Sequence, residues 1–160
     1  MTNSTEITNT IEKYFSAIDT RDWSTAEALM TTPFHLDYSS MGAGPAADLL
    51  PSDILAGWKS ILPGFDHTHH QLGNLDLSVS DSQATVTCHV TATHFIDNVD
   101  NDPIWVVVGT YTIGLVRDET GWKICALTLT FKYQSGNTSL PTIAQDRARP
   151  RPEATKPSEM

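Results

Sequence analysis

Two polar side chains stand where the apolar pattern of the sequence predicts buried positions. Asp19 follows Phe15 by four residues and so continues the apolar stripe of an amphipathic segment that begins near Ile7. His94 is in phase with the apolar side of residues 84–93, where apolar and polar residues alternate. A buried carboxylate needs a partner to stay charged, and a histidine that a carboxylate orients can move protons at neutral pH. The two residues therefore indicate acid–base chemistry.

Three further histidines lie close together in the sequence, and one of them could join this pair. Alternation of the apolar residues 75–79 predicts that His67 and His69 point inward with them. Gly73-Asn74 is a plausible bulge, however, and a bulge would reverse the phase and turn His70 inward instead. The periodicity alone leaves both alternatives open.

Three interpretations of these residues compete. The first is the acid–base chemistry above, and the second is a metal site. We expect no metal, because the chain has no HExxH motif, no paired cysteines and no spacing that fixes a coordination shell. The third is a polar-lined binding pocket without chemistry. In a purely structural alternative, Asp19 only ends a helix at Arg21-Asp22, and His94 is an ordinary histidine at the edge of the core.

The composition disfavours several classes of protein. The 160 residues suit one domain, and 10 basic against 19 acidic residues give a net charge of −9. This charge argues against nucleic acid and anionic membranes as partners. The longest apolar run, residues 104–108, is far too short to span a bilayer, and the first residues show no signal-peptide pattern. We therefore expect a cytoplasmic protein, with Cys88 and Cys125 as buried free thiols.

The elements that must position these side chains come in two blocks. Helical periodicity runs through residues 7–18 and 24–30, and a third helix is predicted over residues 51–62. After one early strand over residues 34–39, strands follow from residue 67 to residue 133. This segregation predicts an α+β fold in which helices pack on one face of a curved antiparallel sheet. A pocket is expected between the two layers.

The end of the sequence differs from the rest. Beyond Gly136 the chain loses its periodicity and becomes rich in proline. We therefore expect residues 1–137 to form the domain, and residues 138–160 to be a disordered or loosely attached tail. In the last strand before this tail, the odd-numbered residues from 125 to 133 are expected to share one face.

Four short stretches of the sequence stand out when they are taken together. They are Phe15-Ser-Ala-Ile-Asp-Thr-Arg-Asp-Trp23, Leu36-Asp-Tyr38, His69-His-Gln-Leu-Gly-Asn74, and Gly121-Trp-Lys-Ile124 followed by Ala126-Leu-Thr128. In this order and at this spacing they resemble the SnoaL-like branch of the nuclear-transport-factor-like superfamily, over roughly residues 5–137. The resemblance implies a cone-shaped α+β barrel, in which a curved antiparallel sheet wraps around the N-terminal helices and a deep pocket.

Within this superfamily the chain resembles the scytalone dehydratases. Asp19 matches that family's pocket aspartate, which stands in a short segment ending in Asp-Trp, and His70 stands in a matching His-x-x-Gly segment. His94 ends a strand as the family's second histidine does, and Tyr38 follows an apolar-Asp pair like the family's pocket tyrosine. The resemblance implies that these residues form the catalytic set. That set is Asp19, His70, His94 and Tyr38.

Other positions depart from the pattern of that family. A second pocket tyrosine precedes the aspartate in the family, where this chain has Ile18. The serine and asparagine that contact the family's substrate fall near Gly109 and Tyr111. The resemblance therefore implies a retained acid–base set with a changed recognition set, and a substrate other than scytalone.

Residues and resemblance together predict a cofactor-independent lyase or isomerase of the dehydratase type. His70 would remove a proton α to a carbonyl, and Asp19 would orient it. His94 would assist a leaving hydroxyl or bind an oxygen, and Tyr38 would hydrogen-bond the carbonyl as it becomes an enolate. The expected substrate is a small hydrophobic carbonyl compound, with a cyclic compound among the candidates, and neither a metal nor an organic cofactor is required. The residues expected to bind it are Phe15, Ile18, Trp58, Val90, Trp105, Tyr111, Leu127 and Phe131.

Other functions remain open at this point. The same fold serves as a non-catalytic binding or assembly module, because a fold does not determine a function. Polyketide cyclisation or epoxide hydrolysis would use the same pocket with other polar residues. The outer faces of residues 104–116 and 122–133 are also apolar, which predicts that another copy covers the sheet in a homo-oligomer, a dimer or a trimer.

Overall fold

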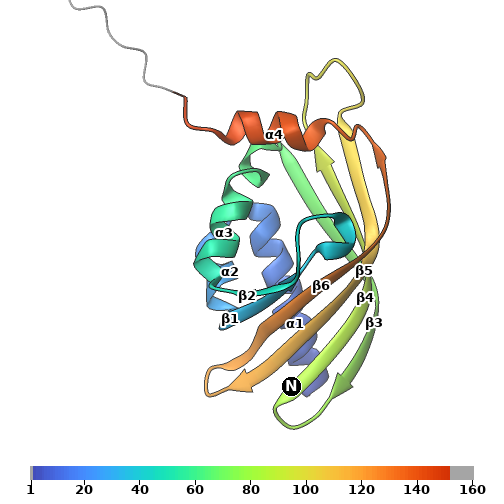
Figure 1. Ribbon diagram of the computed structural model, residues 1–160. Coiled ribbons are helices and arrows are strands. Elements are labelled where there is room, and N and C mark those ends of the chain that lie inside the picture. Colours follow the sequence, from blue (N-terminus) through green and yellow to red (C-terminus); the bar gives the residue numbers. More distant parts are fainter. Residues whose placement is uncertain (1, 152–160) are drawn as a thin grey trace, which may run out of the picture.

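The computed structural model describes residues 2–151 and places helices on one side of a single curved sheet (Figure 1). The helices are α1 (Asn3–Thr20), α2 (Trp23–Ala28), α3 (Pro51–Lys59) and α4 (Leu140–Ala148). The strands are β1 (Met30–Asp37), β2 (Ala47–Leu49), β3 (His67–Val79), β4 (Gln83–Phe95), β5 (Ile104–Asp118) and β6 (Gly121–Gly136). Two short 3₁₀ turns are η1 (Ser39–Met41) and η2 (Leu62–Gly64).

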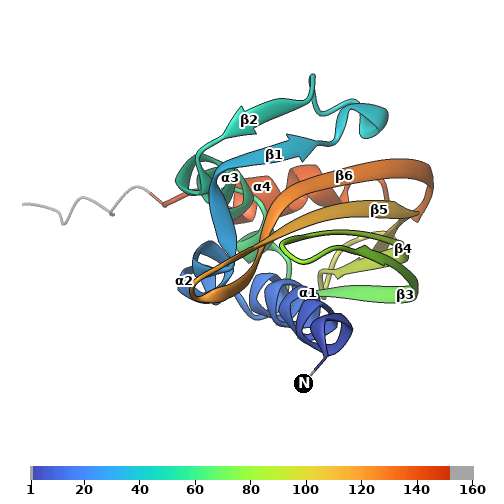
Figure 2. The same ribbon diagram turned by 90° about the horizontal axis from the view of Figure 1, so that it is seen from below.

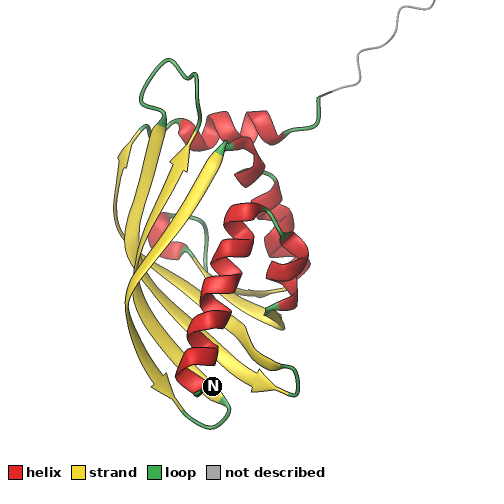
Figure 3. Ribbon diagram, turned by 180° about the vertical axis from the view of Figure 1, so that it is seen from behind, coloured by secondary structure: helices red, strands yellow, loops and turns green. Residues whose placement is uncertain are grey.

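The strand order in the sheet is β2-β1-β6-β5-β4-β3. Strands β3 to β6 form an antiparallel meander, and the N-terminal helix lies against its concave face (Figures 2 and 3). The predicted α+β class and the cone-like arrangement are confirmed. The sheet differs from the expectation in two respects, because β1 pairs with β6 in parallel and the edge strands β2 and β3 do not pair with each other. The sheet is therefore mixed and open, since alternation along a strand predicts its faces and not its neighbours.

Helix α1 buries its apolar stripe as predicted and carries Asp19 in its last turn. Ile7 and Ile11 are fully enclosed, and Thr2 caps the first turn by accepting a hydrogen bond from a backbone amide. The helix ends at Arg21, whose left-handed backbone (φ 62°) directs its N–H back to carbonyls of the last turn. The buried stripe and this fixed end hold Asp19 against β3.

Strand β3 contains the bulge that the sequence suggested. Its register with β4 shifts just after Gly73, and the backbone of Asn74 has a positive φ of 52°. Before this shift His70 faces the helices and is partly buried, whereas His67 and His69 are exposed. The alternative in which a bulge turns His70 inward is therefore confirmed, and the inward orientation of the other two histidines is wrong.

Strand β6 does not keep one continuous inner face. Two shifts of register against β5 interrupt it, so the expectation that odd-numbered residues 125–133 share one face is wrong. Leu127 is buried, Cys125 is only partly buried and Tyr133 is 56% exposed. Of the two thiols expected to be buried, Cys88 alone is fully so, and both are free.

The predicted tail is structured in its first part. Residues 140–148 form α4, and Leu140 and Ala144 on this helix are fully buried. Arg147 anchors it further through an ion pair of 2.8 Å with Asp66. The expectation of disorder is wrong here because a proline in the first turn of a helix loses no hydrogen bond, and Pro141 occupies such a position. Residues 152–160 of the predicted tail lie outside the described residues.

Replacing Gly64 by alanine should loosen the packing of α4. A Cβ at Gly64 would overlap the backbone of Ala144, so α4 or η2 must shift, at a cost of about 1–3 kcal/mol in the free energy of unfolding. Urea denaturation measures this loss. The control is Gly57→Ala in α3, where a Cβ meets open space and alanine should add about 0.5–1 kcal/mol. Equal unfolding free energies for the two variants would contradict the tight contact.

Candidate active site

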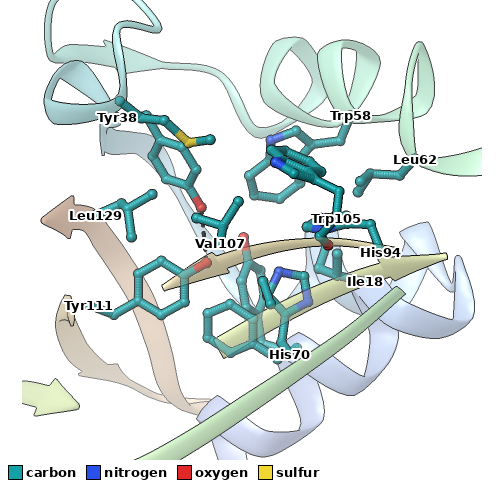
Figure 4. Close-up of a pocket in the computed structure, with 14 residues that line it drawn as sticks. Ile18, Tyr38, Trp58, Leu62, His70, His94, Trp105, Val107, Tyr111 and Leu129 are labelled. Carbon is teal, nitrogen blue, oxygen red and sulfur yellow. Dashed lines mark hydrogen bonds between the residues drawn. The ribbon is translucent and has the colours of Figure 1, made fainter. Parts of the chain in front are cut away.

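A cavity of about 120 Å³ lies between α1, α3 and the concave face of the sheet (Figure 4). Its wall is mainly apolar and aromatic, and the titratable side chains among its lining residues are histidines and tyrosines. Concave apolar pockets with a few convergent polar groups are the usual sites for small molecules. The lining residues are Tyr14, Phe15, Ile18, Tyr38, Met41, Trp58, Leu62, His70, Ala92, His94, Trp105, Val107, Tyr111 and Leu129.

His70 of β3 and Asp19 of α1 form a close pair at the edge of this cavity. His70 Nδ1 lies 2.7 Å from Asp19 Oδ1, and the backbone N–H of His70 donates to Asp19 Oδ2 over 2.8 Å. Thr68 Oγ1 donates a third hydrogen bond to Asp19 Oδ1 over 3.2 Å. Only 11% of the His70 side chain and 15% of the Asp19 side chain are exposed. The carboxylate therefore fixes both the ring and the backbone of the same histidine.

The surroundings of Asp19 keep its carboxylate charged. Burial by itself would raise the pKa of Asp19, but the hydrogen bonds and charge of His70 and the hydrogen bond from Thr68 lower this pKa overall. A charged carboxylate only accepts hydrogen bonds, so His70 Nδ1 carries a proton, and in the neutral ring the lone pair is on Nε2. Because His70 lines the cavity, this lone pair is available to a bound ligand as a general base.

Arg21 ties the end of α1 to the strand that carries His70. Its guanidinium donates to the carbonyls of Ile18 and Asp19, to Thr68 Oγ1 over 2.7 Å and to the carbonyl of Leu62 over 2.7 Å. Since Thr68 in turn donates to Asp19, Arg21 positions the carboxylate through Thr68. Sequence reasoning missed this role, because nothing in the local spacing indicates a bond between Arg21 and a residue on β3.

His94 lies deeper in the cavity and is 6% exposed. Its Nδ1 lies 3.2 Å from the carbonyl oxygen of Trp105, and its ring packs against Trp105 with centroids 4.3 Å apart. Burial, aided by the nearby His70, lowers the pKa of His94 to about 4. The ring is therefore neutral near pH 7. Because a carbonyl only accepts, Nδ1 holds the single proton and Nε2 is an acceptor.

Two tyrosines face each other across the cavity. The hydroxyl oxygens of Tyr38, at the end of β1, and Tyr111, on β5, are 3.3 Å apart (Figure 4). Phe15 stacks on the Tyr111 ring with centroids 5.1 Å apart and holds it in place. The sequence places Ile18 where the resemblance implied a second pocket tyrosine, and the structure supplies Tyr111 from another element. Tyr14 also lines the cavity and was missed.

Four residues of the predicted site do not line the cavity. Asp19 meets it only through His70. Val90 is buried and Phe131 is partly buried, and both pair with Gly109 in the row between the lining residues of β5, whereas Leu127 is buried one row beyond them. Periodicity fixes which face a residue occupies, but not which residues of that face reach the cavity. The lining residues that were missed are Tyr14, Met41, Leu62, Ala92, Val107 and Leu129.

Some of these missed residues carried a signal in the sequence. Ala92 and Val107 are in phase with inward residues of their own strands, and Tyr14 stands beside Phe15 in the helical stripe. Met41 ends the turn η1 and has no periodic pattern around it.

Within residues 2–151, no group of three or more His, Cys, Asp or Glu side chains could hold a metal ion. No helix in that range is long and apolar enough to cross a membrane.

The curved sheet and the N-terminal helices surround an apolar cavity, and a His–Asp pair lies at its edge. The chain is therefore a cone-shaped α+β protein with an internal pocket. More particularly, the chain belongs to the SnoaL-like domain family, whose model matches residues 1–128. This finding agrees with the resemblance stated from the sequence.

Solved structures of similar fold support the same assignment. The Kfla4162 protein from Kribbella flavida is 25% identical with a TM-score of 0.79, over 92% of this chain and 97% of that one. A protein provisionally named a scytalone dehydratase, from Novosphingobium aromaticivorans, is 20% identical with a TM-score of 0.71, over 84% and 87%. The hexachlorocyclohexane dehydrochlorinase LinA-type3 from Novosphingobium barchaimii is 14% identical with a TM-score of 0.69, over 84% and 90%. The last two likenesses show the fold alone. No curated protein matches the chain in sequence.

Proposed function

We propose that the protein is a lyase or isomerase that removes a proton α to the carbonyl of a small hydrophobic substrate. The observation that carries this proposal is the 2.7 Å contact between His70 Nδ1 and Asp19 at the edge of an apolar cavity. A base held in one tautomer by a charged carboxylate is suited to proton abstraction. The family and its dehydratase-type fold neighbours support the same class of chemistry.

The proposed reaction moves only protons and electron pairs. His70 Nε2 takes the α-proton, the C–H electrons form the enolate, and a tyrosine hydroxyl donates to its oxygen. Asp19 stabilises the imidazolium that results. When the enolate collapses, His70 returns the proton to a departing β-hydroxyl, which leaves as water. In the isomerase reaction the substrate is a β,γ-unsaturated ketone, and His70 returns the proton to the γ-carbon of its dienolate, which becomes the conjugated enone. These steps balance without a redox partner, so no cofactor is proposed.

His94 has a narrower role in this scheme than the sequence suggested. With its proton on Nδ1 and directed at the Trp105 carbonyl, it has no Nε2 proton to give to a leaving hydroxyl. Its Nε2 can accept a hydrogen bond from that hydroxyl and so orient it. His70, whose ring centroid is 6.5 Å from that of His94, is then the proton donor of the second half-reaction.

Deuterium exchange tests the proposed function directly. Cyclohexanone in D₂O should lose its α-protons faster with the protein than in buffer, as followed by proton NMR. Elimination from 3-hydroxycyclohexanone, followed by the absorbance of the enone, tests the lyase reaction separately. Exchange and elimination at the buffer rate across a panel of ring ketones would favour the non-catalytic binding module instead.

Replacing Asp19 by asparagine should slow the exchange by about a hundredfold or more. Asparagine can still accept the backbone N–H of His70, so the fold should persist, but it is uncharged and cannot stabilise an imidazolium. The rate of deuterium exchange at saturating ketone measures the effect. The control is Asp22→Asn, an exposed N-cap of α2 three residues away, where asparagine caps as well as aspartate. An unchanged rate in Asp19→Asn would refute the role of the pair.

The predicted homo-oligomer remains a proposal that rests on the outer face of the sheet. Ile104 and Tyr133 on this face are 38% and 56% exposed, and Val106 and Val108 lie beside them on β5. Apolar surface of this kind is commonly covered by another subunit. Sedimentation velocity of the wild type and of Tyr133→Lys tests it, because a lysine on a buried face should shift the protein to the monomer.

A further inference from the structure

Thr68 is a buried threonine on β3, two residues before His70. Its exposed fraction is 7%, and residues two apart on a strand share a face. Both side chains therefore lie on the inner face of β3, next to the end of α1. Burying a hydroxyl is unfavourable unless it is hydrogen-bonded, and valine would fill the same space without that cost. The partners of the Thr68 hydroxyl therefore indicate what it does.

The hydrogen bonds of this hydroxyl have a fixed direction. Arg21 Nη1 lies 2.7 Å from Thr68 Oγ1, which lies 3.2 Å from Asp19 Oδ1. A guanidinium can only donate, so the hydroxyl accepts from Arg21 and gives its single proton to the carboxylate. The same oxygen, Asp19 Oδ1, lies 2.7 Å from His70 Nδ1. One carboxylate oxygen is therefore shared between the ring of the general base and a hydroxyl that Arg21 polarises.

The positive charge of Arg21 acts on both the carboxylate and the cavity. Burial lowers the pKa of Arg21, and the negative charge of Asp19 opposes this change. The pKa of His94 is lowered mainly by burial and then by His70, and Arg21 adds to this decrease. A guanidinium stays protonated in proteins. Its charge is therefore permanent, and it is felt where the imidazolium of His70 forms in the proposed reaction.

Asp19 thus interacts with two cationic groups during the proposed reaction. When His70 takes the α-proton its ring becomes positively charged, and the carboxylate stabilises this charge. Burial raises the pKa of Asp19, and the hydrogen bonds from His70 and Thr68 lower it overall. A donor that stabilises the charged carboxylate makes it a weaker base, so the hydroxyl of Thr68 weakens the bond from His70 Nδ1. A less tightly held imidazolium gives up its proton more readily.

We propose that Thr68 is a positioning residue that couples Arg21 to Asp19 and limits how strongly the carboxylate holds the His70 imidazolium. The inference rests on the proposed function for its effect on the reaction. The coupling speeds the second half-reaction, in which His70 protonates the β-hydroxyl, the C–O bond breaks and water leaves. Thr68 is not among the residues that line the cavity, so it acts through Asp19 and not on the substrate.

The nitrogen chemical shift of His70 Nδ1 tests the coupling without catalysis. It is read through the carbon-bound ring protons in long-range proton–nitrogen NMR spectra at constant pH, and it is assigned by its loss in His70→Gln. In Thr68→Val the carboxylate loses the competing donor, so His70 Nδ1 should bond to it more strongly and shift downfield. Thr68→Ser keeps the hydroxyl and should stay near wild type. Thr87→Val, an exposed threonine on β4, should also change nothing.

Deuterium at C2 of unreacted 3-hydroxycyclohexanone tests the effect on the reaction. In D₂O each enolate either loses its hydroxyl or is reprotonated at C2, and a deuteron marks the second outcome. A more tightly held imidazolium exchanges with solvent more often before it donates. Thr68→Val should therefore leave roughly three- to tenfold more deuterium at C2 for each enone formed, after subtraction of the buffer reaction, because one hydrogen bond to a charged group is lost. Thr68→Ser should match wild type.

A purely structural role for Thr68 predicts a different pattern. If the hydroxyl only ties β3 to Arg21, Thr68→Val melts at a lower temperature, exchange and elimination fall in the same proportion, and the nitrogen shift of His70 Nδ1 does not change. This pattern would overturn the proposal. Thr68→Ala removes the same hydroxyl with a smaller side chain and should repeat the results of Thr68→Val, which keeps the test valid if valine disturbs the packing.

The two measurements separate this inference from the proposed function. If His70 Nδ1 shifts downfield in Thr68→Val but the wild type neither exchanges nor eliminates above the buffer rate, the coupling stands and the proposed function fails. If the wild type is active but the Nδ1 shift is unchanged or moves upfield in Thr68→Val, the proposed function stands and the coupling fails.

Discussion

Replacing His70 by glutamine is expected to lower the rate of α-proton exchange by about two to four orders of magnitude. The proposed reaction takes both of its proton transfers through His70 Nε2, and glutamine offers no basic nitrogen. Glutamine can still donate a hydrogen bond to Asp19, so the buried carboxylate keeps a partner and the fold should hold. The rate constant for deuterium incorporation into cyclohexanone at saturation is the quantity to measure.

The matched control for this variant is His69→Gln. His69 is the neighbouring residue on β3 and is exposed on the opposite face, so its replacement should leave the exchange rate unchanged. A His70→Gln protein that exchanges within threefold of wild type would show that another group is the base. Affinity for benzaldehyde, a ring carbonyl compound without an α-proton, is measured by titration followed by protein NMR. It should stay close to wild type in both variants, which separates the loss of chemistry from a loss of binding.

The part of the site that could be predicted from the sequence is the part that rests on local pattern. Asp19 lies in phase with the stripe of α1, and His94 lies in phase with β4, so helical and strand periods place both inside. His70 needed one further assumption, the bulge at Gly73-Asn74, which glycine and asparagine favour. The α+β class follows in the same way from the order of helical and alternating segments.

The part that could not be predicted depends on contacts between segments far apart in the chain. Tyr38 and Tyr111 meet only because β1 pairs with β6 in parallel and β5 lies next to β6. Arg21 reaches Thr68 because the end of α1 packs on β3. Helix α4 packs on the domain because Leu140 is buried there. The proline-rich sequence around Leu140 does not indicate this burial. Tertiary packing decides such features, and a single sequence contains no direct record of it.

The free energy of unfolding is expected to fall as the pH is lowered from about 6.5 to about 4, and His94 is the main cause. In the unfolded chain a histidine binds a proton near pH 6.5. In the folded protein burial lowers the pKa of His94 to about 4. Between these values the unfolded state binds a proton that the folded state does not, so acid favours unfolding. The difference of 6.5 minus about 4 corresponds to a loss of about 3 kcal/mol.

Asp19 contributes in a separate range of pH. Its pKa is lowered in the folded state, so its stabilising effect is complete above its ordinary value of 3.8 and is lost only as the pH falls below that value. The lowered pKa of His94 already includes the electrostatic effects of its neighbours His70, Asp19 and Arg21. A decline that begins near pH 6.5 therefore belongs to His94 and not to the carboxylate.

Urea denaturation at a series of pH values from 4 to 8 measures this decline, and His94→Gln should remove most of it. Glutamine keeps a donor for the Trp105 carbonyl but does not titrate, so the variant's unfolding free energy should stay nearly level where that of wild type falls. His89→Gln is the control, since His89 lies on the same strand with an exposed side chain, and it should decline as wild type does. If His94→Gln loses stability as steeply as wild type between pH 6.5 and 4, the histidine is not neutral in the cavity. Its assignment as an acceptor for the leaving hydroxyl then fails with it, because a protonated ring has no lone pair to offer.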